Sequence, residues 1–162
     1  MTLGFTGTQI IPLGNTYYVS DVLQTLTDKY HPDKIVTGGC IGIDSYVHHW
    51  YHVNHPEIHR VVTLPNDISK VDMSVCGTAD TLYRDQGSYR DRNKHIVALS
   101  DKMVAFWTGK TIYSGTFMTM NIAYAVGKLD IEDIYGIGCG SSELREIYRD
   151  MKSSVGIQMR LF

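Results

Sequence analysis

The stretch Lys34-Ile35-Val36-Thr37-Gly38-Gly39-Cys40-Ile41-Gly42-Ile43-Asp44 decides the fold class. Its first part is rich in β-branched residues and predicts a short strand. The glycines that follow permit a tight turn, and Asp44 opens a segment with helical spacing that runs to about residue 54. A strand that enters a helix through such a turn is typical of the βαβ unit. The sequence therefore predicts an α/β fold from this stretch outward.

The same alternation of strand and helix continues on both sides of this stretch. Short apolar runs predict strands, and apolar residues at helical spacing predict helices. We expect further strands at 3–6, 60–64, 103–107 and 134–137, with a closing strand at 155–162, and further helices at 15–30, 89–99, 116–126 and 141–152. Repeated βα units favour a Rossmann-like three-layer α/β/α sandwich with a mostly parallel sheet.

Residues 66–87 interrupt this rhythm because they are polar and show no clear period. A connection of this length inside a compact domain is usually functional or mobile. We expect it to cover a ligand site. The chain has 162 residues with no internal repeat or linker, so a single domain over residues 1–162 is expected.

Composition and charge exclude several classes of protein. Hydrophobic residues make up 43% and charged residues 20% of the chain, a globular balance that excludes disordered chains and coiled coils. The formal net charge of -2 argues against a chain built to coat nucleic acid or an anionic membrane. Residues 1–9 lack the positive start and apolar run of a signal peptide, and the apolar runs are too short to span a membrane. We expect a cytoplasmic protein.

Cysteine and histidine spacing gives little support for a metal site. Cys40, Cys76 and Cys139 lie far apart, which fits neither a disulfide framework nor a cysteine-based zinc site. Five histidines lie between residues 48 and 59, and His48 and His52 share a helix face as metal ligands do. A solvated or packed histidine face is the more common arrangement, so we predict no metal.

Two segments of small residues follow predicted strands at the sheet edge where ligands bind. Residues 38–42 precede one helix, and Ser114-Gly115-Thr116 open another. Main-chain N–H groups at a helix N-terminus favour phosphate. The alternative is that the glycines serve only close packing and that Ser114 or Thr116 only caps its helix. If the two segments converge in space, they form one phosphate site.

Other candidate residues surround these two segments. Arg92 and Asn93 lie near the start of a predicted helix, where a cation gains nothing from the helix dipole, so Arg92 needs a partner. That partner is a ligand phosphate or, alternatively, the carboxylate of Asp85 or Asp91. Asp44 is the candidate acid or base, unless it only caps its helix. The predicted site residues are Gly7, Thr8, Gln9, Gly38, Gly39, Cys40, Ile41, Gly42, Asp44, Arg92, Asn93, Ser114, Gly115 and Thr116.

Three segments resemble the DNA-processing protein A (DprA/Smf) family. Residues 38–44, GGCIGID, with His48 resemble its glycine-rich GID…H segment. Residues 92–101, RNKHIVALSD, resemble its RNRIIAGLSD segment, and Ser114-Gly115-Thr116 with residues 123–128 resemble its SG(S/T)…A…GK segment. Order and spacing agree over residues 3–128. This resemblance points to the SLOG superfamily of Rossmann-like domains, and in length and in residues 4–9 to its small stand-alone phage and bacterial members.

The resemblance implies one site for a nucleotide or nucleotide derivative, and a nucleotide-directed hydrolase if the protein is an enzyme. The LOG-type enzymes of this superfamily carry a catalytic glutamate in a PGGxGTxxE motif. Here Thr116 is followed by Phe117-Met118-Thr119-Met120 with no carboxylate, so activity stays open. The alternative is a DprA-like protein that binds single-stranded DNA, and a third is an interaction module. Expected partners are a nucleotide-like small molecule and further copies in a homodimer or higher homo-oligomer, with nucleic acid second. No cofactor is assigned.

Overall fold

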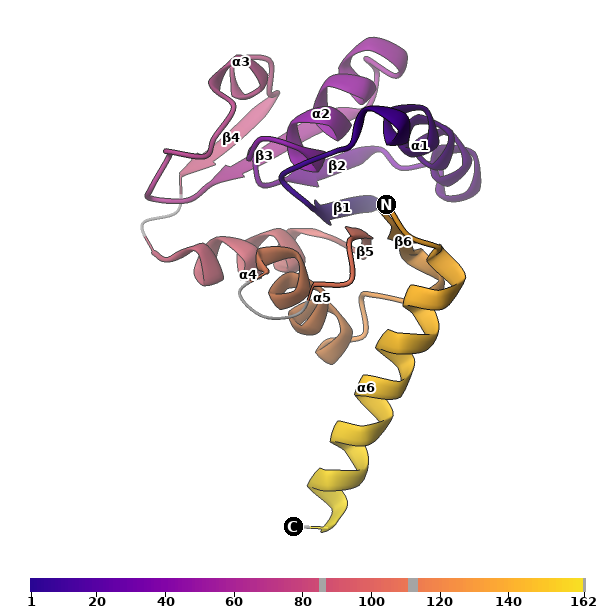
Figure 1. The fold of residues 1–162 in the computed structure, drawn as a ribbon. Coiled ribbons are helices and arrows are strands. Elements are labelled where there is room, and N and C mark those ends of the chain that lie inside the picture. The colour runs from indigo at the N-terminus through magenta and orange to yellow at the C-terminus, as the bar shows by residue number, and fades with distance from the viewer. Residues whose placement is uncertain (85–86, 111–113, 162) are drawn as a thin grey trace.

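The computed structural model describes residues 1–84, 87–110 and 114–161. In these ranges six strands form one sheet in the order β4-β3-β2-β1-β5-β6 (Figure 1). The strands are β1 (Thr2–Gly7), β2 (Lys34–Thr37), β3 (His59–Leu64), β4 (Thr81–Arg84), β5 (Lys102–Trp107) and β6 (Ile134–Gly136). Every pair of neighbouring strands is parallel, which confirms the expected α/β class.

Helices cover both faces of the sheet and complete the three layers (Figure 1). The helices are α1 (Thr16–Tyr30), α2 (Ile43–Asn54), α3 (Met73–Cys76), α4 (Tyr89–Leu99), α5 (Gly115–Ala125) and α6 (Ser141–Leu161), with 3-10 turns η1 (Leu13–Asn15) and η2 (Ile131–Asp133). α1 and α2 lie on one face, and α4 and α5 lie on the other. The Rossmann-like sandwich expected from the sequence is confirmed.

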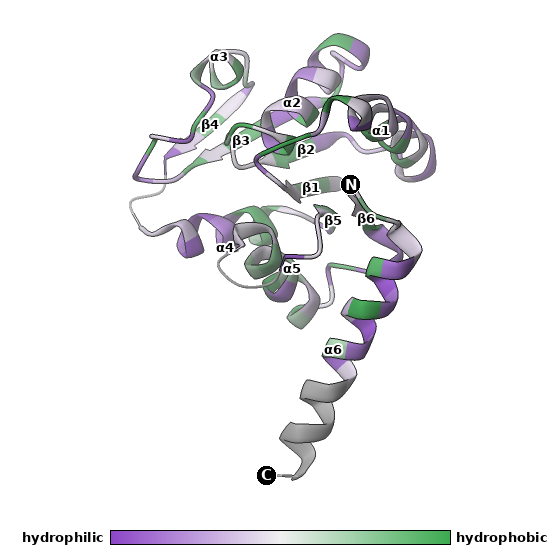
Figure 2. Cartoon of the chain, in the orientation of Figure 1, coloured by the Kyte–Doolittle hydropathy of each residue, from purple (hydrophilic) through white to green (hydrophobic). Residues whose placement is uncertain are grey.

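Two hydrophobic clusters hold the layers together, and strand β5 contributes to both. Val104 and Phe106 face the cluster under α1 and α2, whereas Met103, Ala105 and Trp107 face the cluster under α4 and α5. A parallel strand that is buried on both faces is apolar throughout. Figure 2 shows that α1, α2 and the coloured part of α6 carry both hydrophobic and hydrophilic residues along their length.

The segment expected to be an irregular connection, residues 66–87, contains a helix and a strand. The four-residue helix α3 is capped by Asp72, whose carboxylate accepts a hydrogen bond from Ser74 N at 3.1 Å. The four-residue strand β4 pairs with β3 at the sheet edge, where Leu82 and Tyr83 stay exposed. Both elements are too short and too exposed to show an apolar period. Residues 85 and 86 lie outside the described ranges.

The closing strand expected at 155–162 is wrong, because α6 continues as a helix to Leu161. The expectation rested on local β-branched residues such as Val155 and Ile157. A helix that has already started adds residues at little cost, and buried Leu144 and Tyr148 anchor its first turns in the core. Propagation from this anchor overrides local strand propensity. Residue 162 lies outside the described ranges.

In the described ranges, no helix combines the length and apolar character that crossing a bilayer requires. The three cysteines are free thiols, of which Cys40 and Cys76 are buried and Cys139 is exposed. Cysteines, histidines and carboxylates in these same ranges form no cluster of three that would hold a metal ion.

Candidate ligand-binding site

A cavity of about 480 Å³ lies at the carboxyl ends of β1 and β5. These two strands are neighbours, but β2 follows β1 on one side and β6 follows β5 on the other. The strand order therefore reverses between them, and open parallel sheets bind ligands at such a reversal. The volume also falls within the range of roughly 300–1,000 Å³ that is typical of small-molecule sites.

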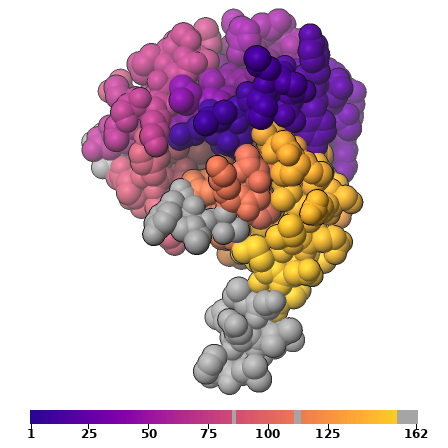
Figure 3. Space-filling view, in the orientation of Figure 1, coloured from indigo at the N-terminus to yellow at the C-terminus, as the bar shows by residue number. Residues whose placement is uncertain are grey.

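The structure brings most of the predicted site residues to this cavity. Figure 3 shows the indigo segment after β1 close to the orange segment near residue 110 on the molecular surface. The predicted residues that line the cavity are Gly7, Thr8, Gln9, Cys40, Asp44, Arg92, Asn93, Ser114, Gly115 and Thr116. They come from the end of β1 and the loop after it, the turn before α2 and the first turn of α2, and the starts of α4 and α5.

Backbone hydrogen bonds fix the loop after β1 at one side of the cavity. Thr8 N donates to Phe106 O at 3.2 Å, and Thr8 O accepts from Ile43 N at 3.0 Å. Gly7 permits this approach, because a Cβ there would lie 2.5 Å from the Ile43 side chain. The loop is thus held between β5 and the start of α2, and it presents Thr8 and Gln9 to the cavity.

The glycines before α2 make close packing contacts. The predicted residues outside the cavity lining are Gly38, Gly39, Ile41 and Gly42. Gly39 has a φ of +73°, and a Cβ there would meet Val62 at 2.9 Å and Cys76 at 3.1 Å. Gly42 has a φ of +92°, and its Cβ would lie 2.4 Å from Thr8 O. The turn therefore packs tightly against β3 through Gly39 and against the loop after β1 through Gly42. Cys40 is the one residue of this turn that lines the cavity.

Arg92 is the buried link between α4 and this turn. Its guanidinium donates to the carbonyl oxygen of Gly38, and its Nη2 lies 3.5 Å from Cys40 Sγ. Its Nε donates to Asn93 Oδ1 at 3.0 Å. Arg92 thus uses carbonyl, thiol and amide partners. Asp91, one of the expected ion-pair partners, accepts from Ser88 N in a capping box at the start of α4, and Asp85 lies outside the described ranges.

Asp44 is a buried carboxylate in the cavity wall. Its Oδ2 accepts a hydrogen bond from Cys40 N at 3.3 Å, while Gly42 takes the N-cap position of α2. Asp44 therefore braces the turn instead of capping its own helix. Burial raises the pKa of Asp44 to about 6, although Arg92 and the backbone N–H groups of the turn pull it down. Burial and Asp44 also raise the pKa of the Cys40 thiol, which leaves it protonated at neutral pH.

The N-terminus of α5 opens onto the cavity from the other side. Ser114 caps the helix, since its Oγ accepts from Phe117 N at 3.2 Å and its carbonyl accepts from Met118 N at 3.1 Å. The N–H groups of a first helical turn have no acceptor within the helix. Among the described residues, no atom lies within 4 Å of a Cβ placed on Gly115, so this side of the turn is open. Ser114 can therefore cap α5 while the N–H groups of the first turn remain available to an anion.

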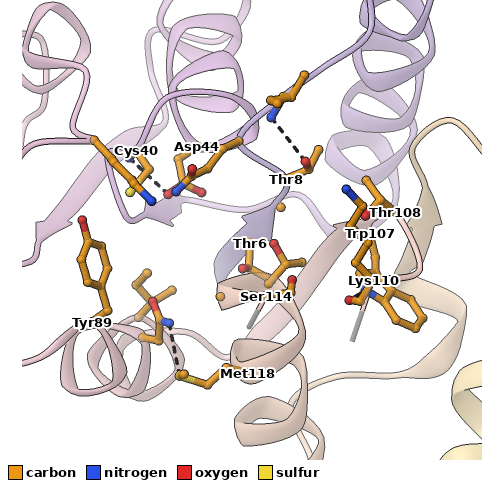
Figure 4. Close-up of a pocket in the computed structure, with 18 of the residues that line it drawn as sticks. Thr6, Thr8, Cys40, Asp44, Tyr89, Trp107, Thr108, Lys110, Ser114 and Met118 are labelled. Carbon is orange, nitrogen blue, oxygen red and sulfur yellow. Dashed lines mark hydrogen bonds between the residues drawn. The ribbon is translucent and has the colours of Figure 1, made fainter. Parts of the chain in front are cut away.

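Several cavity residues were missed by the sequence analysis. They are Ile10, Lys70, Tyr89, Ile96, Trp107, Thr108, Lys110 and Met118. Figure 4 shows Tyr89 on the side of α4 and Lys110 with Trp107 on the opposite side, where the Trp107 indole N–H donates to Lys110 O at 2.8 Å. Thr108 and Lys110 directly follow β5, so the rule that ligands bind at strand ends was the signal that could have found them.

Lys70 and Tyr89 reach the cavity through contacts that the sequence does not reveal. Lys70 O accepts from Ile41 N at 3.0 Å, and the next residue, Val71, forms an antiparallel bridge with Cys40. The Tyr89 hydroxyl donates to Asp67 O at 3.2 Å. Residues 67–71 therefore lie against the turn and α4, as expected of a covering segment.

His48 and His52 make no common site. His48 is fully buried, and its Nε2 lies 2.9 Å from Thr78 Oγ1, whereas His52 is exposed. The two side chains therefore lie in different environments, one packed in the core and one exposed to solvent.

Comparisons with known proteins identify the fold. Neither protein-family models nor curated proteins gave a match. Among solved structures, TM1055 is similar with a TM-score of 0.57 and 18% identity, over 79% of this chain and 71% of that one. DNA processing protein A from Helicobacter pylori, whose structure concerns its single-stranded DNA binding mode, is similar with a TM-score of 0.57 and 15% identity, over 93% and 81%. The chain therefore shares the Rossmann-like fold of these two structures.

Proposed function

We propose that the protein binds a nucleotide or a nucleotide derivative in the cavity at the ends of β1 and β5. The observation that carries the proposal is the convergence of the β1 loop and the α5 N-terminus on one cavity at the strand-order reversal. Lys70 and Lys110 also line this cavity, and Asp44 is the one carboxylate among its described lining residues. This balance of charge favours an anionic ligand.

The phosphate would lie at the N-terminus of α5. The N–H groups of Gly115 and Thr116 and the helix dipole favour negative charge there, and the space beside Gly115 is open. Of residues 38–42, only Cys40 lines the cavity, and its N–H already donates to Asp44 Oδ2. The α5 turn would therefore hold the anion, without main-chain N–H groups from residues 38–42.

The nucleoside would extend toward α4 and the β1 loop. Asn93 Oδ1 accepts from Arg92 Nε, while among the described residues Asn93 Nδ2 has only a long contact of 3.8 Å to Met118 Sδ. This amide therefore offers N–H donors to a sugar or base oxygen. The Tyr89 ring gives an aromatic face for base stacking, and Thr8 and Gln9 supply polar groups at the opposite wall.

Hydrolysis of the ligand would use Asp44, since a carboxyl group with a pKa of about 6 exchanges a proton near neutral pH. The test is to incubate the protein with candidate nucleotides and to separate the products by chromatography. Product formation that is lost in Asp44→Asn supports an enzyme. Binding without product defines a binding protein.

The experiment for ligand binding is a thermal-shift screen with nucleoside mono-, di- and triphosphates, phosphoribosylated compounds and inorganic phosphate. A ligand that binds only the native state raises Tm in proportion to its concentration relative to Kd. We expect one nucleotide class to raise Tm at concentrations where inorganic phosphate does not. A screen in which no nucleotide raises Tm contradicts the proposal.

Single-strand nucleic-acid binding is the second candidate function, favoured by the likeness to a DNA processing protein over 93% of the chain. The net charge of -2 weighs against it. Oligonucleotide binding is measured at two salt concentrations. Affinity that falls steeply with salt supports this candidate, and absence of binding at low salt removes it.

A further inference from the structure

A buried polar cluster lies under α2, apart from the cavity lining. His48 on α2 is fully buried, and its Nε2 lies 2.9 Å from Thr78 Oγ1. Arg60 on β3 is also buried, and it donates from Nη2 to Thr78 O at 3.0 Å. The Arg60 guanidinium further lies 3.6 Å from the Asp80 carboxylate. One histidine and one arginine therefore converge on the residues just before β4.

The hydrogen bonds define which His48 nitrogen carries the proton. Thr78 Oγ1 donates its single proton to Val75 O at 2.8 Å, so it accepts from His48 Nε2. The proton of neutral His48 is therefore on Nε2, and Nδ1 is bare. His48 Nδ1 is buried and has no hydrogen-bond partner in the described part of the chain. A second proton on this ring must enter at Nδ1, where no acceptor receives it.

Positive charge is already present beside this ring. Arg60 Nε and Nη1 are buried without partners among the described residues, so Asp80 only partly compensates the guanidinium. His52 and His49 on α2 also disfavour a positive charge on the His48 ring, and His59 Nε2 on β3 lies 2.8 Å from Thr81 Oγ1 on β4. A buried, poorly compensated imidazolium is costly, because a charge needs partners or water.

The residues that this cluster holds form a weakly anchored edge. Residues 71–84 comprise α3 and β4, and Leu82 and Tyr83 on β4 are exposed. Polar contacts supply much of the attachment, since Arg60 N donates to Asp80 Oδ2 at 2.9 Å and Asp72 N donates to Gly39 O at 2.9 Å. The apolar attachment is a small cluster in which Cys76, Val71 and Ala79 pack against Val62 and Leu64. Segments with few buried apolar contacts open locally at low free energy.

We propose that His48 is an acid-sensitive latch, whose protonation at Nδ1 against Arg60 releases residues 71–84 from the sheet. Neutral His48 holds Thr78 and, through it, the junction of α3 and β4. In the open state the imidazolium reaches water. This inference does not depend on what the cavity binds.

The direction of the pH effect follows from the surroundings of the ring. Burial and then Arg60 lower the pKa of His48 to about 4, with His52 and His49 adding to the effect and Asp80 opposing it. The open segment leaves His48 near its ordinary pKa of about 6.5. The open state therefore binds the extra proton more readily. As pH falls from about 6.5 toward 4, the free energy that favours the closed state over the open state decreases. Asp44, which also titrates in this range, has a raised pKa and so favours the folded state on acidification.

The test is amide hydrogen exchange at pH 7 and pH 5, expressed as protection factors that correct for the intrinsic pH dependence. We expect protection over residues 71–84 to fall by about tenfold at pH 5, while amides of β1 and β5 keep theirs. His48→Gln keeps an amide donor at the Nε2 position and cannot be protonated, so its protection should not change with pH. His49→Gln, a neighbouring exposed histidine, should behave like the wild type.

Three results would overturn the latch: no loss of protection at pH 5, an equal loss across the whole sheet, or the same local loss in His48→Gln. If His48→Gln does not fold, NMR of the wild-type imidazole decides instead. A ring that carries its proton on Nε2 and stays neutral at pH 5 agrees with the latch. A ring that is protonated at pH 6 in the closed protein contradicts it.

Discussion

Gly39 and Gly115 belong to the two segments of small residues, 38–42 and 114–116. A side chain would be crowded at Gly39 but would have space at Gly115. At Gly39 the φ is +73° and a Cβ would meet Val62, Leu64 and Cys76 at 2.9–3.1 Å. We predict that Gly39→Ala costs roughly 1–3 kcal/mol of unfolding free energy. Gly115→Ala meets open space at the first turn of α5 and should change stability by less than about 0.5 kcal/mol. Urea denaturation of both variants measures the difference, and equal stabilities would refute this account of the turn.

Asp44 and His48 lie on the same helix, α2, and folding shifts their pKa values in opposite directions. Folding raises the pKa of Asp44 from 3.8 to about 6, so its contribution to stability grows on acidification through pH 6. Folding lowers the pKa of His48 from 6.5 to about 4, so its contribution is lost as pH falls below 6.5. Each effect amounts to about 2 kcal/mol between pH 6.5 and 4.5. The two effects nearly cancel in the wild type.

We therefore predict a nearly flat stability between pH 6.5 and 4.5 for the wild type. Asp44→Asn retains only the His48 effect and should lose stability as pH falls, whereas His48→Gln should gain it. Urea midpoints at several pH values test this pair. Parallel pH profiles for the two variants would show that the opposing titrations are wrongly assigned.

At the scale of elements, the cap of α4 determines where Arg92 and Asn93 lie. Ser88 Oγ accepts from Asp91 N, and the Asp91 carboxylate accepts from Ser88 N at 3.0 Å. Replacing an N-cap serine with alanine usually costs about 1 kcal/mol. Ser88→Ala should therefore lower the unfolding free energy by about that amount, while the control Ser142→Ala, an exposed residue at the start of α6, should stay near zero. Equal losses would argue against the capping box.

Elements with a long apolar period were predictable, and short or edge elements were not. α4 begins and ends where the spacing of Ile96 and Val97 predicts, because its inner face is buried. β4 was not predicted, because a four-residue edge strand with exposed Leu82 and Tyr83 shows no alternation of apolar and polar residues. The end of α6 was misread because strand propensity is local, whereas helix continuation depends on the turns already formed.

At the scale of the whole molecule, the site position followed from one topological rule. Parallel strand ends meet at one edge, so the segments after β1 and β2 and the start of α5 were expected to lie together, and Thr8, Cys40 and Ser114 do line one cavity. Lys70 was predicted only as part of the covering segment 66–87 and not as a site residue, because the bridge between Val71 and Cys40 is what brings it to the cavity. Such a contact joins distant parts of the chain and leaves no periodic trace in the sequence.

The central claim is that the N-terminus of α5 holds an anionic group of a nucleotide. The most direct measurement is isothermal titration of the nucleotide that raises Tm most into the wild type, Gly115→Asp and Gly115→Asn. An acidic residue in a first helical turn stabilises the helix by about 0.3–1 kcal/mol, so Gly115→Asp should fold at least as well as the wild type. We predict that Gly115→Asp weakens binding by more than tenfold, while Gly115→Asn, of the same size without charge, stays within a few-fold. Equal Kd values for all three proteins would contradict the claim.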